Sequence, residues 1–324
     1  MGASFKAILV VVCVVLSACG GGGGGGESTT VVTPPPVTDY SCDPVTTLAS
    51  MPKTSVFTST NEPIPIGVPL KVATVERWPL TIDGEAHQLN VAIARPDAGV
   101  PVKGVVINGH GQADVQATLP STVLANLYWD TQMTSRGYIS VTVARRGNYG
   151  STGNMYAAIP DLSAQSEMTF FKYQAASLVS VMNKMATDPA YQPYMSTILL
   201  VGASGGSDTV IQTAVDSAVF KTATKKAVIR FDGGVGTGSA VTAEGRAAII
   251  AGLDEYATLI AKQGVSSFWV VGDQDTLTNP GWVACQYKFY NRTAGYTNTF
   301  YVVPGMGHEN YTRLFSPELR QIFR

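Results

Sequence analysis

The sequence predicts an α/β protein with a mostly parallel central sheet of about eight strands, helices on both faces and an antiparallel hairpin at the N-terminal edge. Short apolar runs alternate with longer segments of helical periodicity, which requires crossover connections between parallel strands. The first two predicted strands, 71–76 and 88–94, instead lie on either side of the turn-forming pair Asp83-Gly84. That pair predicts the edge hairpin.

The parallel part begins at VKGVVIN (102–108), an uninterrupted apolar run of the kind that is buried on both faces of a sheet. Sheets of this type place their chemistry at the carboxyl ends of the strands, so the loops that follow the strands are where functional residues are expected. Strands are expected at 102–108, 138–144, 197–201, 227–231, 267–271 and 299–303, with helices at 121–136, 167–186, 207–220, 245–262 and 280–294.

Composition narrows the function classes. Hydrophobic residues make up 45% of the 324 residues and charged residues 14%, which suits one large domain with a substantial core. The formal net charge of −1 leaves no basic surface for nucleic acid, so nucleic acid is not an expected partner. The sequence contains neither a phosphate-binding glycine loop nor the cysteine and histidine spacings of metal sites, and no cofactor is expected.

The N-terminus predicts export. Residues 1–18 have the pattern of a signal peptide, with a lysine before an apolar core that is too short to span a bilayer. The core ends in LSAC, which resembles the bacterial lipobox and implies that Cys19 is acylated, with palmitate-type chains anchoring the protein to a membrane. The glycine following Cys19 implies the outer membrane of a diderm bacterium. Residues 19–45, rich in glycine and proline, then form a tether to a domain at 46–324.

Cys42 and Cys285 are the cysteines left after the signal peptide and the lipid anchor. In an oxidising compartment they could form a disulfide between the start of the domain and its C-terminal half. Two unpaired thiols are the alternative, because sequence alone does not give the distance between the two Cα atoms.

The segment ILLVGASGGSD (198–208) places Ser204 between glycines at the end of a predicted buried strand and just before a predicted helix. A tight turn alone would account for the glycines. The strand, turn and helix context, however, favours a nucleophile elbow, in which small neighbours allow a strained turn to expose the serine hydroxyl.

Five motifs in order, NGHGQ, ARRGNYGSTG, GASGG, GDQD and PGMGH, resemble the α/β-hydrolase superfamily, in particular its branch of dienelactone hydrolases and prolyl-oligopeptidase catalytic domains. The resemblance covers residues 102–310. It implies a serine, an acid and a histidine in that chain order.

A histidine must activate the serine, and the chain contains His87, His110 and His308. By the implied order only His308, after the last predicted strand, is placed correctly. Asp275, after the penultimate strand, is the expected acid that orients the imidazole. Asp273 is expected to brace the same turn, and Asp232, after the preceding strand, is the reserve candidate for the acid.

Acyl transfer also needs two donors for the oxyanion. The resemblance implies the N–H of Gly205 as one and the N–H of Gln112, in the loop INGHGQAD (107–114), as the other. This loop reads NGHG where many relatives have NHG, so the identity of the second donor stays open. His110 is expected to be structural.

The resemblance thus implies a membrane-tethered serine hydrolase that cleaves small or extended carboxylic esters through an acyl-enzyme. Esters are expected rather than peptides because edge strands and a tether stand where prolyl oligopeptidases carry a propeller. A peptidase acting on short peptides and a non-catalytic, ligand-binding lipoprotein with the same fold are the alternatives.

Overall fold

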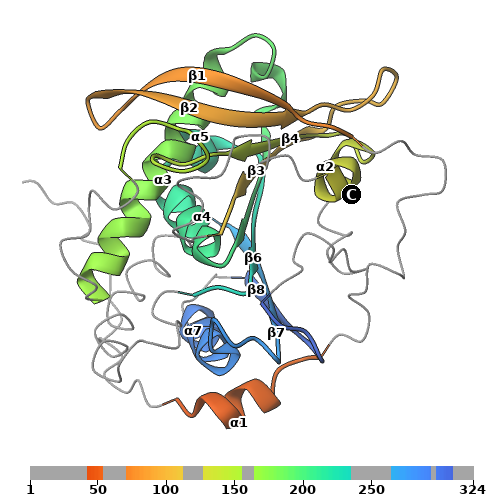
Figure 1. The fold of residues 1–324 in the computed structure, drawn as a ribbon. Coiled ribbons are helices and arrows are strands. Elements are labelled where there is room, and N and C mark those ends of the chain that lie inside the picture. Colours follow the sequence, from red (N-terminus) through yellow and green to blue (C-terminus); the bar gives the residue numbers. More distant parts are fainter. Residues whose placement is uncertain are drawn as a thin grey trace, which may run out of the picture. The chain divides into compact units, whose positions relative to one another are not determined.

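The computed structural model describes residues 42–53, 71–111, 127–154, 164–234, 264–292 and 297–308, all within the unit Tyr40–Arg324. In this part of the chain one sheet has the strand order β1-β2-β4-β3-β5-β6-β7-β8 (Figure 1). β1 pairs antiparallel with β2, and β2 with β4, whereas every other neighbouring pair is parallel. The predicted fold class and the antiparallel N-terminal edge are therefore confirmed.

The strands are β1 (Thr74–Ile82), β2 (Glu85–Ala94), β3 (Gly104–Gly109), β4 (Tyr138–Val143), β5 (Thr197–Ala203), β6 (Lys225–Phe231), β7 (Ser266–Gly272) and β8 (Thr297–Val303). The helices are α1 (Pro44–Ala49), α2 (Leu127–Thr134), α3 (Ala164–Thr187), α4 (Gly205–Asp216), α5 (Ala218–Thr222) and α7 (Pro280–Arg292). The helix expected at 245–262 lies outside the described residues, as do Cys19, the signal peptide and the tether up to residue 41.

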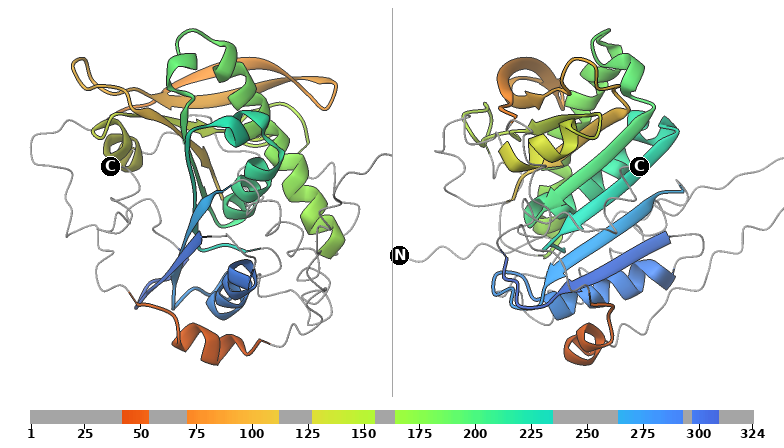
Figure 2. Two further views of the ribbon diagram at one scale, coloured as in Figure 1. Left: turned by 180° about the vertical axis from the view of Figure 1, so that it is seen from behind. Right: turned by 90° about the vertical axis from the view of Figure 1, so that its right-hand side faces the viewer.

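The central strands β3, β4, β5 and β6 are buried on both faces of the sheet, which is why they read as mainly apolar runs. Val105 and Ile107 of β3 belong to the core cluster that includes residues of α3, α4 and α7, whereas Val106 lies in a second cluster with Trp129 and Met133 of α2. Figure 1 and Figure 2 show α2 on the opposite side of the sheet from α3, α4 and α7.

The edge strand β1 is longer than the sequence predicts and continues through Pro79 to Ile82. Proline has no N–H for a ladder hydrogen bond, and an edge strand tolerates it because only one side of the strand is paired. The hairpin turn is as expected: Asp83 and Gly84 both have positive φ, 53° and 85°, which a two-residue turn of this type requires.

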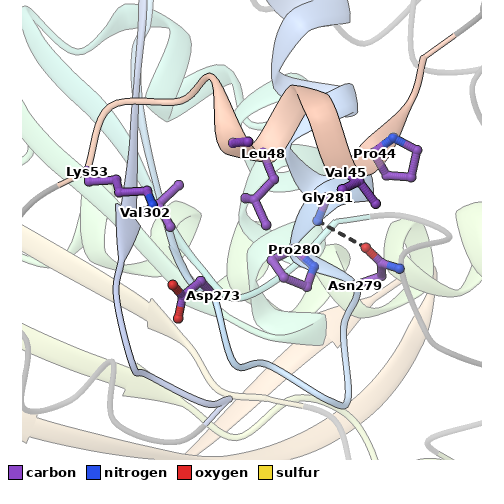
Figure 3. Close-up of a pocket in the computed structure, with 10 residues that line it drawn as sticks. Pro44, Val45, Leu48, Lys53, Asp273, Asn279, Pro280, Gly281 and Val302 are labelled. Carbon is purple, nitrogen blue, oxygen red and sulfur yellow. Dashed lines mark hydrogen bonds between the residues drawn. The ribbon is translucent and has the colours of Figure 1, made fainter.

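The segment 42–53 lies beside β8 and α7 at the other edge. Cys42, two residues before the start of α1, forms a disulfide with Cys285 in the middle of α7. α1 begins at Pro44, just before the boundary expected at residue 46, and Asp43 caps it by accepting from the Val45 N–H. A surface hollow of about 240 Å³ lies between α1 and the start of α7. Figure 3 shows the residues that line it.

The described helices include none that is both long and apolar enough to cross a membrane.

Candidate active site

The carboxyl ends of the parallel strands bring the predicted site residues to one edge of the sheet. The register pairs Ala203 with Phe231, so Ser204 follows β5 next to the end of β6. It also pairs Gly272 with Val303, which sets the loop containing Asp275 beside the loop containing His308.

Ser204 occupies a strained turn between β5 and α4. Its φ of 52° and ψ of −130° are unfavourable for a residue with a side chain, at a cost of about 1–3 kcal/mol. The Ser204 N–H donates to the Phe231 carbonyl at 2.9 Å, which holds the turn against β6. A serine at a helix N-cap usually accepts a backbone N–H with its hydroxyl, but Ser204 makes no such capping bond. The hydroxyl is therefore not used to cap α4.

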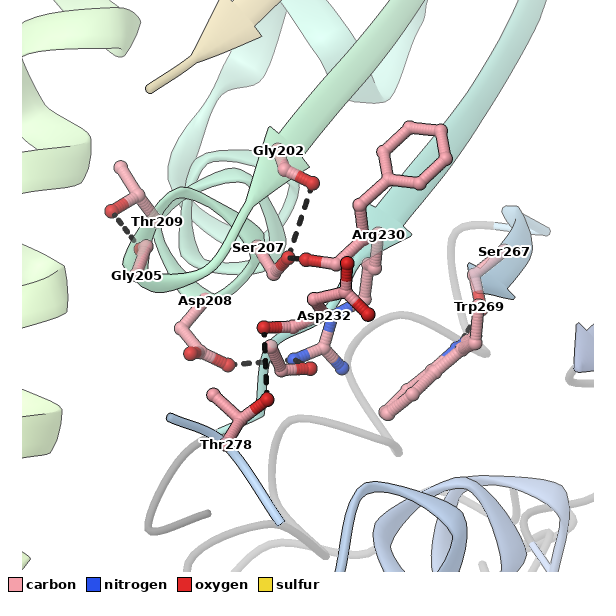
Figure 4. A network of polar contacts seen from close by, with 12 residues as sticks. Gly202, Gly205, Ser207, Asp208, Thr209, Arg230, Asp232, Ser267, Trp269 and Thr278 are labelled. Atoms are coloured by element: carbon pink, nitrogen blue, oxygen red, sulfur yellow. Dashed lines mark hydrogen bonds and ion pairs between the residues drawn. The ribbon is translucent and has the colours of Figure 1, made fainter. Parts of the chain in front are cut away.

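Two glycines permit this turn because backbone passes where a side chain would be. A Cβ on Gly202 would lie 2.2 Å from the Gly206 carbonyl oxygen, and a Cβ on Gly206 would lie 2.1 Å from that of Gly109. The Ser207 hydroxyl contacts the Gly202 carbonyl at 3.1 Å and the Phe231 carbonyl at 2.8 Å. Figure 4 shows the contact with Gly202. The first turn of α4 is thus locked onto β5 and β6.

A buried ion pair between β6 and α4 also fixes the position of this helix on the sheet. The Arg230 guanidinium of β6 donates to Asp208 of α4 at 2.6 Å, and both side chains are almost fully buried (Figure 4). The guanidinium also lies over the Trp269 ring, with its carbon 3.8 Å from the ring centroid. Breaking this pair would leave a buried charge, so it holds α4 in one position on the sheet.

Asp275 and His308 form the central polar pair of the edge. His308 Nδ1 lies 2.8 Å from Asp275 Oδ2, and the Asp275 side chain is 1% exposed. The other carboxylate oxygen accepts from the N–H groups of Leu277 and Thr278, each at 2.9 Å, and the Thr278 hydroxyl donates to Oδ2.

These contacts keep Asp275 ionised. Burial raises the pKa of Asp275, but the hydrogen bonds from His308 and Thr278 together outweigh burial, so the pKa lies below its ordinary value. An ionised carboxylate can only accept, so Nδ1 carries the proton and a neutral His308 has its basic lone pair on Nε2. This is the tautomer that a general base needs.

The other two carboxylates have different partners. Asp273 accepts the N–H of Gly305 at 2.7 Å and so ties the loop after β7 to the loop after β8. Asp232 accepts the N–H of Gly272 at 2.8 Å. Burial, and secondarily the negative charge of Asp275, raise the pKa of Asp232 to about 7, while the Gly272 N–H opposes this rise. Asp275 is the carboxylate hydrogen-bonded to His308.

Of the two expected oxyanion donors, the structure describes Gly205 but not Gln112. Gly205 is the first residue of α4, where N–H groups have no acceptor within the helix and the helix dipole favours negative charge. Gln112 lies outside the described residues, which end this loop at Gly111.

His110, which the sequence predicts to be a structural residue, is buried. Its ring packs edge-on against the ring of Tyr149, with centroids 4.8 Å apart.

One residue of this edge was missed by the sequence reasoning. Arg145, two residues after the end of β4, is fully buried and contacts the His110 loop and α4. The motif ARRGNYGSTG marked its loop, but nothing in the pattern distinguished Arg145 from its neighbour Arg146.

The described residues contain no group of three or more His, Cys, Asp or Glu side chains suited to a metal ion.

Comparison of the sequence with protein-family models and with curated proteins gives no match. Solved structures do match. The Pyrococcus furiosus esterase Pf2001 is 15% identical with a TM-score of 0.52, and the alignment covers 84% of this chain and 95% of that one. Est1E from Butyrivibrio proteoclasticus, solved with ferulic acid bound, is 13% identical with a TM-score of 0.51, covering 75% and 96%. Acylaminoacyl peptidase from Pyrococcus horikoshii is 14% identical with a TM-score of 0.51; the alignment covers 74% of this chain but 38% of the peptidase.

At these identities the likeness concerns the fold. Strand order, antiparallel edge and helical layers agree with it, and the chain has the α/β-hydrolase fold.

Proposed function

We propose that this protein is a serine hydrolase that cleaves carboxylic esters, with Ser204 as nucleophile, His308 as general base and Asp275 as the acid that orients it. The observation that carries the proposal is the 2.8 Å hydrogen bond between Asp275 and His308, at the same sheet edge as the strained Ser204 turn. Three side chains from three separate loops supply the nucleophile, the base and its orienting acid.

The proposed reaction proceeds in two steps. His308 Nε2 takes the proton of the Ser204 hydroxyl as its oxygen attacks the ester carbonyl, and Asp275 stabilises the imidazolium that forms. The Gly205 N–H and a second N–H, for which Gln112 is the candidate, stabilise the oxyanion. The alkoxide leaves with the proton from the imidazolium, and water then releases the acid from Ser204 by the same sequence.

The comparisons favour esters over peptides as substrates. Two of the similar structures are esterases that align over nearly their whole length, whereas the peptidase aligns over 38% of its chain. Short peptides are the second candidate substrate class because the peptidase shares the same fold.

The test measures hydrolysis of p-nitrophenyl acetate and butyrate, and labelling by a fluorophosphonate, with the full chain in detergent. Ser204→Ala should lose both turnover and labelling. Asp275→Asn should keep the fold and lower kcat by about 10³–10⁴-fold, because the imidazole loses its orienting carboxylate. Asp273→Asn is the matched control in the same loop: its amide oxygen can still accept the Gly305 N–H, so kcat should stay close to wild type.

The alternatives predict other results. Turnover of short peptide p-nitroanilides without ester turnover would favour the peptidase. A folded wild type that neither labels nor hydrolyses either substrate would overturn the proposal and favour a ligand-binding protein.

We also propose that the protein is exported and anchored through acylated Cys19 to the outer membrane of a diderm bacterium. The sequence around Cys19 supports this. Metabolic labelling with a palmitate analogue should mark the wild type and not Cys19→Ser, and equal labelling of both would refute the anchor.

A further inference from the structure

Arg145 holds the carbonyl groups of the loop that follows β3. Its Nη2 donates to the His110 carbonyl at 2.8 Å and to the Gly111 carbonyl at 2.7 Å. The side chain is fully buried, and hydrogen bonds from a charged donor are about twice as strong as neutral ones. The loop is thus held by a fixed charge rather than by a solvent-exposed contact.

The His110 ring strengthens the same arrangement. The Arg145 N–H lies 3.3 Å from Nε2, and Nδ1 lies 2.7 Å from the Gly111 carbonyl oxygen. The neutral tautomer with its proton on Nδ1 satisfies both contacts: Nε2 accepts from the backbone and Nδ1 donates to the carbonyl. Arg145 Nη2 also lies 3.1 Å from Nδ1 and donates to it in the other tautomer. With the proton on Nδ1, the Gly111 carbonyl receives two donors.

The other end of the guanidinium contacts the helix that begins at the proposed nucleophile. Nη1 of Arg145 donates to the Thr209 hydroxyl at 2.6 Å. That hydroxyl donates to the Gly205 carbonyl at 2.9 Å, and Figure 4 shows this second contact. Thr209 is fully buried as well. Arg145 thereby bridges the loop after β3 and the first turn of α4, the two segments that would supply the oxyanion donors.

The Gly111 carbonyl and the N–H of residue 112 belong to one peptide unit. Because that unit is planar, fixing its carbonyl constrains the direction of its N–H. A charge-assisted bond to the carbonyl oxygen also polarises the unit, which makes the N–H a stronger donor. The carbonyl half of this unit is described, and it is the half that Arg145 contacts.

We propose that Arg145 is the positioning residue of the oxyanion site. Its guanidinium sets the orientation and polarity of the peptide unit that begins at the Gly111 carbonyl, and the hydrogen bond to the Thr209 hydroxyl orients the guanidinium. The inference rests on the proposed function. Arg145 would act through the loop without touching the substrate, so its loss should weaken binding of the transition state far more than binding of the ester.

Arg146 provides a matched control. It is as buried as Arg145 and adjacent to it, but it donates to Asp83 at 2.8 Å and to the Tyr173 carbonyl, with its guanidinium over the Tyr173 ring. It thus braces the hairpin and α3 instead of the β3 loop. Substituting Arg146 should therefore lower the thermal stability, while kcat falls much less than it does when Arg145 is substituted.

The test compares Arg145→Met, Arg146→Met, Thr209→Val and Thr209→Ser by kcat and KM for p-nitrophenyl butyrate, by Ki for a trifluoromethyl ketone, and by Tm. Arg145→Met should lower kcat by about 10²–10³-fold with little change in KM, and raise Ki in parallel with KM/kcat. Thr209→Val, which keeps the side-chain shape, should lower kcat about 10-fold, and Thr209→Ser should restore it.

The outcomes separate the two proposals. If the wild type turns over and Thr209→Val equals Thr209→Ser in kcat and Ki, the positioning role is refuted, whether or not Arg145→Met folds. An equal loss of kcat in Arg145→Met and Arg146→Met would refute it as well. A wild type without turnover or labelling refutes the proposed function itself.

Discussion

Asp232→Asn should remove a pH dependence of stability that the wild type carries. The Asp232 carboxyl is buried, with 3% of the residue exposed, and its positive φ of 44° is one that asparagine also tolerates. The amide oxygen of asparagine can accept the Gly272 N–H as the carboxylate does. The substitution therefore removes the titration and preserves the geometry.

The magnitude follows from the rise in the pKa of Asp232, from its ordinary value of 3.8 to about 7 in the folded state. Between these values the folded protein binds a proton that the unfolded chain has lost, so the free energy of unfolding falls as pH rises. A tenfold change in a proton-binding constant corresponds to about 1.4 kcal/mol, so this carboxyl lowers stability by about 3 kcal/mol between pH 4 and pH 7 and by nearly 4 kcal/mol by pH 8. Asp275, whose pKa is lowered in the folded protein, is present in both the wild type and the variant, so its own titration largely cancels when the two stability curves are compared.

Urea unfolding at intervals between pH 4 and pH 8 measures the effect. Wild type and Asp232→Asn should be about equally stable near pH 4, and the variant should gain over the wild type by about 4 kcal/mol by pH 8. Parallel stability curves over this range would show that Asp232 is ionised in the folded protein at pH 5, and the reasoning from burial would be wrong.

Two further variants, one single and one double, test how the fold is held together. Gly206→Ala should destabilise the protein by about 3 kcal/mol or more, although alanine normally favours a helix, because its Cβ would lie 2.1 Å from the Gly109 carbonyl oxygen; a Tm at or above that of wild type would contradict the close contact. Replacing Cys42 and Cys285 together by serine should lower the free energy of unfolding by about 3–5 kcal/mol, because the bridge closes a loop with a sequence separation of 243. The same urea curves should show no further loss when reductant is added to this double variant, and equal stability of wild type and variant under oxidising conditions would mean that the bridge does not form.

The parallel strands could be predicted because burial on both faces leaves a simple pattern. The runs at 102–108 and 227–231 each coincide with a strand to within two residues at either end. The hairpin could be predicted for a local reason as well, since Asp83-Gly84 suits the positive φ values of its turn.

Other features depend on contacts that no local pattern encodes. The helix expected at 207–220 begins at Gly205 and is interrupted at Ser217, whose side chain accepts the Phe220 N–H and starts α5. The extension of β1 through Pro79 depends on its place at the edge of the sheet. Likewise, the choice between Arg145 and Arg146 depends on which guanidinium points toward the β3 loop, and that direction exists only in the fold.

Backbone strain offers a separate reason to attribute function to this edge. Besides Asp83 in the hairpin, the described non-glycine residues with positive φ are Tyr149, Ser204 and Asp232, which follow β4, β5 and β6. A turn that only reversed the chain would be easier with glycine, and the loop of Tyr149 does use glycine for positive φ at Gly147 and Gly150.

Ser204 and Asp232 have positive φ although both carry side chains, which costs backbone strain. Backbone hydrogen bonds to neighbouring strands hold both residues in place. The Ser204 N–H donates to the Phe231 carbonyl, and the Asp232 N–H donates to the Val270 carbonyl, each at 2.9 Å. Strain retained in this way is explained by what the side chain does rather than by how the chain turns. For Asp232 that role is the hydrogen bond to the Gly272 N–H, at the start of the loop that carries Asp275. For Ser204, whose hydroxyl does not cap α4, the role that we propose is that of the nucleophile.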